Sequence, residues 1–256
     1  RNPQKDWVKP RGLIRFLSGG QSYADIPGLE REMHQALDME KLQRIADAGT
    51  TGRMLAVNTT NLDTAEMCVW DIVAESQRAV RDGNADRVQQ ILLASASIPG
   101  AFPPRLIDGF LYVDGGVTGN ILYIGQRGDV GNDGFLARWI AAYPNTPLPT
   151  VRYWVIFNNE FRWPPEIVQP EWFDVLGKSS TTSTRATTLN SMRQLFLQAE
   201  LARLKHQANV EVRLVAVPDG WVAPEPGVFK KQTMNALADL GEKMGADPAS
   251  WRTTPP

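Results

Sequence analysis

The chain has very few of the side chains on which most simple catalytic centres are built. It has one cysteine and two histidines among 256 residues. Cys68 cannot form a disulfide within the chain and is either a small buried hydrophobe or a reactive thiol. His34 and His206 lie in separate helical stretches outside any motif, which argues against a triad in which histidine activates a serine. No Asp, Glu and His residues have metal-ligand spacing, so the sequence implies no metal and no other cofactor.

The chain also lacks a strong net charge and a long apolar run. Its 27 basic and 28 acidic residues give a formal net charge of −1, which argues against a nucleic-acid partner. No apolar segment approaches the roughly 18–20 residues that cross a bilayer. The chain begins at Arg1 without a signal peptide, so we expect any targeting segment to have been removed or to lie outside it.

Hydrophobic periodicity predicts strands and helices in alternation. Residues 1–12 carry no periodicity and are interpreted as a linker or severed arm, whose basic side chains are either solvated or near anionic lipid. Residues 13–256 show no internal repeat, which favours one domain. Strands are expected at 53–60, 66–70, 151–157 and 210–217, with two short strands within 105–113. Two helices are expected within 25–48, and single helices at 71–82, 84–96, 135–143, 170–206 and 229–244. This order indicates an α/β layer fold with a mostly parallel sheet, in which 151–157 is an internal strand.

The stretch from Ile91 to Tyr123 contains the most informative local signals. Its apolar start is typical of the end of a buried helix, which the prolines from Pro99 onwards then stop. Asp108-Gly109 lies between two short apolar runs and predicts a type I′ hairpin turn.

Asp114 is the candidate for chemistry in this stretch. It follows a strand-like run and precedes Gly115 and Gly116, which we expect to let the backbone turn sharply with positive φ and to bring main-chain N–H groups close to a ligand or a neighbouring side chain. A carboxylate at a strand end beside such a backbone is where α/β enzymes place a catalytic acid or base. The alternative is an aspartate that only caps a turn.

The sequence around Asp114 resembles that of the patatin-like phospholipase family. The specific part is ASASIPGAFPP followed, after a short gap, by DG-x-LYVDGGVTGN; RMLAVNTTNLDTAEMCVWD and residues 22–29 are also similar, so that the likeness covers most of 10–250. The resemblance implies a three-layer α/β/α fold and a Ser-Asp dyad in which Asp114 is the partner of a serine nucleophile. It further implies that the motif is supported by Pro99, Gly115, Gly116 and Asn120.

Two parts of the family pattern do not occur in this sequence. The family takes its nucleophile from Gly-x-Ser-x-Gly and its oxyanion hole from a glycine-rich loop. The nearest stretch, Ser18-Gly19-Gly20-Gln21-Ser22, has neither the spacing of a nucleophile elbow nor a preceding apolar strand. We therefore expect residues 13–256 to be the carboxy-terminal portion of a patatin-like domain, incomplete at its N-terminal side, with the serine upstream of Arg1 on a further fragment of the same domain.

The resemblance predicts a lipid acyl hydrolase, a phospholipase A or esterase, in which Asp114 is the general base. It implies a lipid or acyl-ester substrate, contact with a membrane surface, and a location in the bacterial cell envelope or outside the cell. One alternative is a non-catalytic patatin-like protein that binds lipid or a partner. Another is an unrelated hydrolase that uses Asp108 or Asp114 with a metal.

Overall fold

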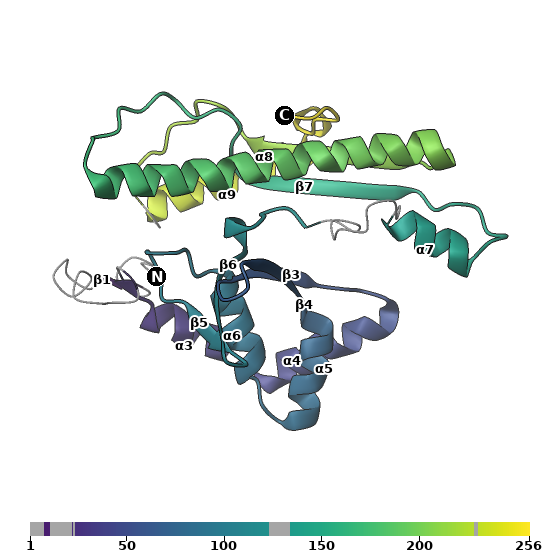
Figure 1. The fold of residues 1–256 in the computed structure, drawn as a ribbon, viewed down its shortest axis with the longest axis horizontal. Coiled ribbons are helices and arrows are strands. Elements are labelled where there is room, and N and C mark those ends of the chain that lie inside the picture. Colours follow the sequence, from purple (N-terminus) through teal and green to yellow (C-terminus); the bar gives the residue numbers. More distant parts are fainter. Residues whose placement is uncertain (1–7, 11–21, 23, 123–133, 228–229) are drawn as a thin grey trace. The chain divides into compact units, whose positions relative to one another are not determined.

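The computed structural model describes residues 8–10, 22, 24–122, 134–227 and 230–256 (Figure 1). The chain divides into two compact units. The N-terminal unit comprises 1–120 with 227–231, and the C-terminal unit comprises 121–226 with 232–256. Of the predicted arm at 1–12, only 8–10 are described, and there β1 (Lys9–Pro10) pairs with β2 (Ala24–Asp25). The rest of the arm lies outside the described residues.

A four-stranded antiparallel sheet organises the N-terminal unit. Its order is β4-β3-β6-β5, and every neighbouring pair runs antiparallel. The strands are β3 (Ala56–Asn61), β4 (Glu66–Asp71), β5 (Arg105–Ile107) and β6 (Phe110–Asp114). In the central pair, Thr59 lies directly across from Asp114. The sheet therefore joins the two stretches of sequence that carry the predicted motif.

The prediction of a mostly parallel central sheet is wrong. Two of the three strand pairs are hairpins, and a short turn can only join antiparallel neighbours. The predicted type I′ turn is confirmed in one of them, with φ of 51° at Asp108 and 83° at Gly109. The alternation of strands and helices along the chain suggested parallel crossovers, but β6 returns beside β3 with opposite direction.

Helices pack on this sheet around one apolar core. The helices are α3 (Pro27–Ala36), α4 (Met39–Ala48), α5 (Ile72–Asp82) and α6 (Asp86–Ser95), with the 3-10 turn η1 (Gly49–Thr51) after α4. Asp38 and Asp71 cap the starts of α4 and α5 through their carboxylates, as side chains of this type commonly do. The core residues, drawn from α4, α5, α6 and three strands, are Leu42, Trp70, Ile72, Ala79, Val88, Ile91, Ala94, Ile107 and Tyr112.

The C-terminal unit is built on two parallel strands joined by a long helix. Its elements are α7 (Gly134–Ala142), β7 (Val151–Glu160), α8 (Trp172–His206), β8 (Val210–Val217), α9 (Lys231–Ala246) and η3 (Pro248–Ser250). The parallel pairing of β7 and β8 confirms the predicted direction of these strands. None of the helices in the described part of the chain has the length and apolar character of a membrane span.

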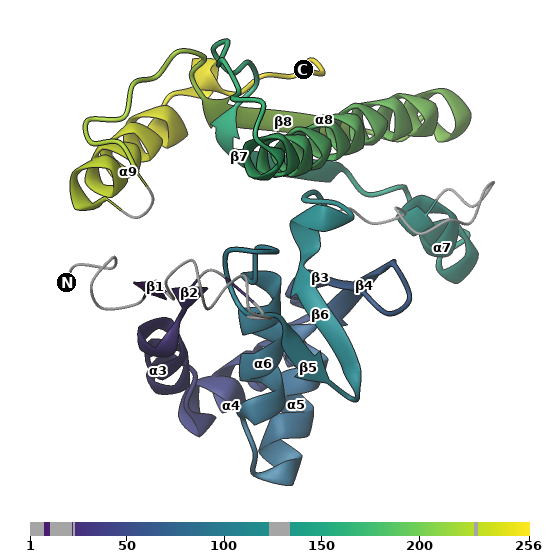
Figure 2. The same cartoon turned by 60° about the vertical axis from the view of Figure 1, so that its left-hand side comes forward.

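The two faces of β7 and β8 differ. Alternate residues beginning at Val151 and Val210 form a core with Leu195 and Ala199 of α8, as expected for a strand–helix–strand unit. The other face carries Trp154 and is partly open to solvent. The prediction that β7 is an internal strand buried on both faces is therefore wrong. Figure 2 shows α8 against the strands and α9 separate from α8.

Arg87 connects three elements of the N-terminal unit. Its Nε donates to the Glu75 carboxylate of α5 at 2.8 Å, and its Nη1 contacts both oxygens of Asp108 in the β5–β6 turn at 2.6 and 2.7 Å. Its guanidinium also lies 5.4 Å from the centre of the Trp70 ring. Arg87 and Glu75 are mostly buried, so the cation satisfies a carboxylate that water reaches poorly.

We expect Arg87→Gln to lower the free energy of unfolding by about 1–3 kcal/mol, since it leaves a mostly buried Glu75 without its cation. The matched control is Arg78→Gln, because the Arg78–Asp82 pair is exposed and 3.6 Å apart. The control should change stability by less than about 0.5 kcal/mol. Urea unfolding of both variants measures the difference, and equal effects would contradict the role given to Arg87.

Candidate active site around Asp114

The main chain of Asp114 is fixed from two sides. Its N–H donates to the Ser97 carbonyl at 2.9 Å, which joins the end of β6 to the segment that follows α6. Its carbonyl accepts from the Thr60 hydroxyl of β3 at 3.1 Å. Asp114 is also the last residue of β6, as the sequence predicted. The backbone that carries this carboxylate is therefore held by strand pairing and by two further hydrogen bonds.

The Asp114 side chain is half-buried and only partly engaged. Its Oδ1 accepts from the Gly116 N–H at 2.7 Å. Within the described residues, Oδ2 has no hydrogen-bond partner. Burial raises the pKa of this carboxyl above its usual range, and the Gly116 hydrogen bond opposes that rise. The group is thus a stronger base than an ordinary aspartate, with one oxygen anchored and the other available.

The two glycines after Asp114 are required by close approach and not by φ. Neither has a positive φ, so the expectation of a left-handed turn there is wrong. A Cβ on Gly115 would lie 2.3 Å from Asn58 Nδ2 and 2.6 Å from the Asn58 carbonyl oxygen. A Cβ on Gly116 would lie 2.5 Å from Asn120 Oδ1 and 3.0 Å from Asp114 Oδ1. The predicted approach of a main-chain N–H to the carboxylate is confirmed at Gly116.

Asn120 lies close to Asp114, whereas Pro99 is connected to Asp114 only through the turn that follows Ser97. The Asn120 side chain lies over Gly116, in the space that a Cβ would fill, and is exposed. Pro99 is the second residue of a tight turn in which Ala101 N–H donates to the Ile98 carbonyl at 3.1 Å and Gly100 has φ 79°. That turn directly follows the residue whose carbonyl receives the Asp114 N–H.

Three polar residues that support this loop did not stand out in the sequence. Asn58 Nδ2 donates to the Gly119 carbonyl at 2.6 Å. The Thr60 and Thr118 hydroxyls lie 2.9 Å apart, so that one donates to the other. The run Asn58-Thr59-Thr60 inside a strand was the available signal, because consecutive polar residues in a buried strand need partners.

Other candidate residues are engaged elsewhere. The Asp108 carboxylate is held by Arg87, as described above, and Cys68 packs against the N-terminal core as a partly buried hydrophobe. The Ser97 hydroxyl is fully buried and donates to the Leu93 carbonyl at 2.8 Å. Ser18 lies outside the described residues. Across 8–10, 22, 24–122, 134–227 and 230–256 there is no cluster of three or more His, Cys, Asp or Glu side chains able to hold a metal.

We expect Gly115→Ala to destabilise the N-terminal unit by about 1–3 kcal/mol, because the new methyl group would overlap the Asn58 backbone. Gly177→Ala is the matched control: Gly177 lies in α8 with nothing within 4 Å of an added Cβ. In that control the free energy of unfolding should rise by about 0.5–1 kcal/mol, because alanine has a higher helix propensity than glycine. Thermal unfolding distinguishes the two, and a Gly115→Ala protein as stable as the parent would contradict the packing described here.

Asp114→Asn is expected to raise the melting temperature at pH 7. Because burial raises the folded-state pKa, ionisation of Asp114 costs stability as the pH rises from about 3.9, the unfolded value, through the folded pKa. Asparagine avoids that cost and retains an acceptor for Gly116. The gain should shrink as the pH falls and vanish below about 3.9, where the carboxyl becomes protonated in the unfolded state as well.

The contrasting variant is Asp38→Asn. The Lys41 side chain and its N–H lower the pKa of Asp38, so its contribution is present above the unfolded pKa and is lost in acid. Asp38→Asn should therefore lower the melting temperature at pH 7, with a difference that also disappears in acid. If Asp114→Asn were the less stable form at pH 7, the environment assigned to Asp114 would be incorrect.

The comparison with known protein families covers less than half of the chain. Residues 3–123 match the family model described as patatin-like phospholipase, a range that includes Asp114, the two glycines and Asn120. A search of curated proteins gives no match. Members of the matched family are serine lipid hydrolases with an α/β fold. The resemblance predicted from the sequence is therefore supported over residues 3–123, and this stretch of the chain is similar to patatin-like phospholipases.

Proposed function

We propose that Asp114 is the general base and orienting partner of a serine nucleophile in the hydrolysis of lipid acyl esters. The observation that carries this proposal is the half-buried carboxylate at the end of β6, with Oδ1 bound to Gly116 and Oδ2 without a partner among the described residues. A general base needs a raised basicity and a free lone pair within reach of the proton it removes. The family match over residues 3–123 supports the reaction class.

Asp114 Oδ2 then removes the proton from the serine hydroxyl while the serine oxygen attacks the ester carbonyl. The same carboxyl returns the proton to the departing alcohol, which leaves an acyl-serine. A water molecule, activated in the same way, releases the fatty acid and restores the serine. A carboxylate can perform these steps without histidine only if it is ionised at the working pH, and the Gly116 N–H favours that form.

The serine of this proposal comes from a segment N-terminal to Arg1. Two observations support that assignment. The sequence contains no Gly-x-Ser-x-Gly. Ser97, whose carbonyl accepts from the Asp114 N–H, is fully buried and its hydroxyl donates to the Leu93 carbonyl. The polypeptide or coding sequence immediately before Arg1 tests this part directly: a Gly-x-Ser-x-Gly there supports it.

The proposal predicts that Asp114→Asn, made in a protein that includes the segment before Arg1, lowers ester hydrolysis at least about 1,000-fold. The circular dichroism spectrum of the variant should match that of the parent, because asparagine keeps the contact with Gly116. Turnover of a phospholipid with a fluorescent acyl chain measures the effect.

Asp108→Asn is the matched control. It makes the same chemical change at the other end of β6, in a residue that is paired with Arg87 and is 61% exposed. Its turnover should stay within about twofold of the parent, since Asp108 is an exposed residue of the β5–β6 turn and does not contact the loop that holds Asp114. Full activity of Asp114→Asn would overturn the dyad. A parent protein that binds lipid vesicles but hydrolyses no ester would also overturn it, because that protein would be a non-catalytic lipid-binding protein.

A further inference from the structure

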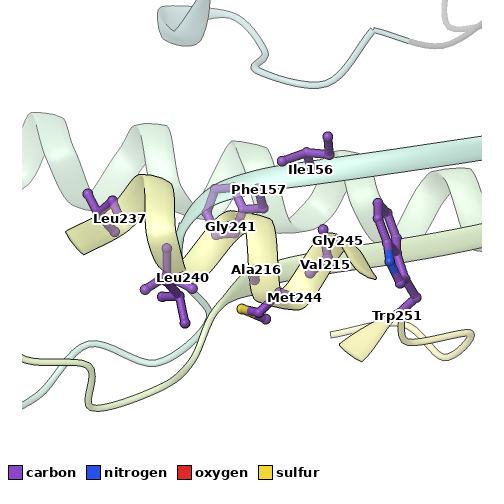
Figure 3. A pocket seen from close by; sticks show the side chains of 11 residues that line it. Ile156, Phe157, Val215, Ala216, Leu237, Leu240, Gly241, Met244, Gly245 and Trp251 are labelled. Carbon is purple, nitrogen blue, oxygen red and sulfur yellow. The ribbon is translucent and has the colours of Figure 1, made fainter. Parts of the chain in front are cut away.

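The C-terminal unit contains an apolar cavity between α9 and the end of its two strands (Figure 3). Its volume is about 120 Å³. Side chains or backbone atoms from β7, β8, α9 and the segment after it line it; the residues are Ile156, Phe157, Val215, Ala216, Val217, Leu237, Leu240, Gly241, Met244, Gly245 and Trp251. None of them is charged, and the tryptophan nitrogen is the only polar side-chain atom in the set. The cavity suits a hydrocarbon.

The α9 helix leaves this space open. None of the 16 residues of α9 is buried, although Met234, Leu237 and Leu240 lie on one side of it. Gly241 and Gly245 face the cavity one turn apart, and a Cβ added at either would meet nothing within 4 Å. Each glycine in a helix interior costs about 1 kcal/mol relative to alanine. Alanine would fit at both positions and would stabilise the helix. The packing of the protein itself therefore does not require glycine, and with it the open space, at these positions.

The size and lining of the cavity fit a methylene chain. Apolar cavities of roughly this size, about 150 Å³ in a well-studied engineered case, stay dry and take up small hydrocarbons. From Leu237 to Gly245 the lining follows α9 for about 12 Å at 1.5 Å per residue. The lining thus extends along the helix, as a linear chain requires.

Two arginines lie over aromatic rings that contact lining residues of the cavity. The Trp251 ring lies 4.9 Å from that of Trp154, over which the Arg213 guanidinium is placed at 4.8 Å. Arg252 lies 5.0 Å from the centre of the Phe161 ring. Phe161 in turn stacks on Phe157, a lining residue, at 5.7 Å between centroids.

Arg252 is a cation that a ligand could reach. It is exposed, and within the described residues it makes no salt bridge; its only side-chain hydrogen bond is to the Pro255 carbonyl at 3.3 Å. Arg213, in contrast, has Glu211 at 3.5 Å. The main chain of Arg252 is fixed, because it exchanges two hydrogen bonds with Leu214 of β8. The guanidinium of Arg252 thus lies over Phe161, the ring that stacks on the lining residue Phe157.

We propose that this cavity binds a fatty carboxylate, with its alkyl chain along α9 and its carboxylate at Arg252. The ligand class follows from the apolar lining and from Arg252, a cation without a salt bridge among the described residues that is linked to the lining through Phe161. Binding involves no bond cleavage and no participation of Asp114, so the inference is independent of the proposed hydrolysis.

Isothermal titration of the full chain with decanoate, below its micelle concentration, tests the proposal. Gly241→Leu places an isobutyl group in the cavity and should raise the dissociation constant at least about tenfold, because several methylene groups lose their contacts. Ala238→Leu is the matched control: Ala238 is exposed on the same helix and does not line the cavity. It should bind as the parent does, and both variants should keep the parent's melting temperature or exceed it.

A second comparison tests the head group. Arg252→Gln should weaken decanoate binding by about three- to fivefold, as expected for an exposed ion pair, and leave the binding of 1-decanol unchanged. A decyl phosphate that binds more tightly than decanoate would replace the carboxylate by a phosphate ligand and overturn the stated class. No decanoate binding by the parent, or equal binding by Gly241→Leu, would overturn the site. Asp114→Asn should bind decanoate as the parent does, which separates this result from the fate of the hydrolase proposal.

Discussion

The position of Asp114 depends on the antiparallel pairing of β6 with β3. That pairing sets Asp114 across from Thr59 at the point where β6 ends. The hydrogen bonds to Ser97 and Thr60 then fix the peptide groups on both sides of its Cα. A carboxylate on such a backbone loses little entropy when it engages a reacting group, and preorganisation of this kind is what a catalytic base requires.

The same loop shows how close packing replaces conformational freedom at a functional position. The chain after Asp114 passes so near to the Asn58 backbone that only glycine fits at 115, and a side chain at 116 would have to displace the Asn120 side chain. This close approach brings the Gly116 nitrogen to 2.7 Å from Asp114 Oδ1, so that its N–H donates to the carboxylate. Burial raises the pKa of the group while this hydrogen bond lowers it, so the loop balances basicity against ionisation.

Local features were predictable from the sequence and long-range ones were not. Asp108-Gly109 specified its hairpin, and Asp114 was correctly placed at a strand end, because turn chemistry and a short apolar run act over a few residues. The direction of the central sheet was wrong, since the order of strands along the chain does not say which edges pair. The contact of Thr60 with Thr118, 58 residues apart, has no signature in either stretch alone.

In the proposed reaction a carboxylate, and not a histidine, is the base that activates an alcohol. The most direct measurement is the pH dependence of kcat/KM for ester hydrolysis by a protein that includes the segment before Arg1. The account predicts one acid limb, with a pKa above about 3.9, that belongs to Asp114. A limb near about 6.5, the ordinary value for histidine, that persists in Asp114→Asn would contradict it.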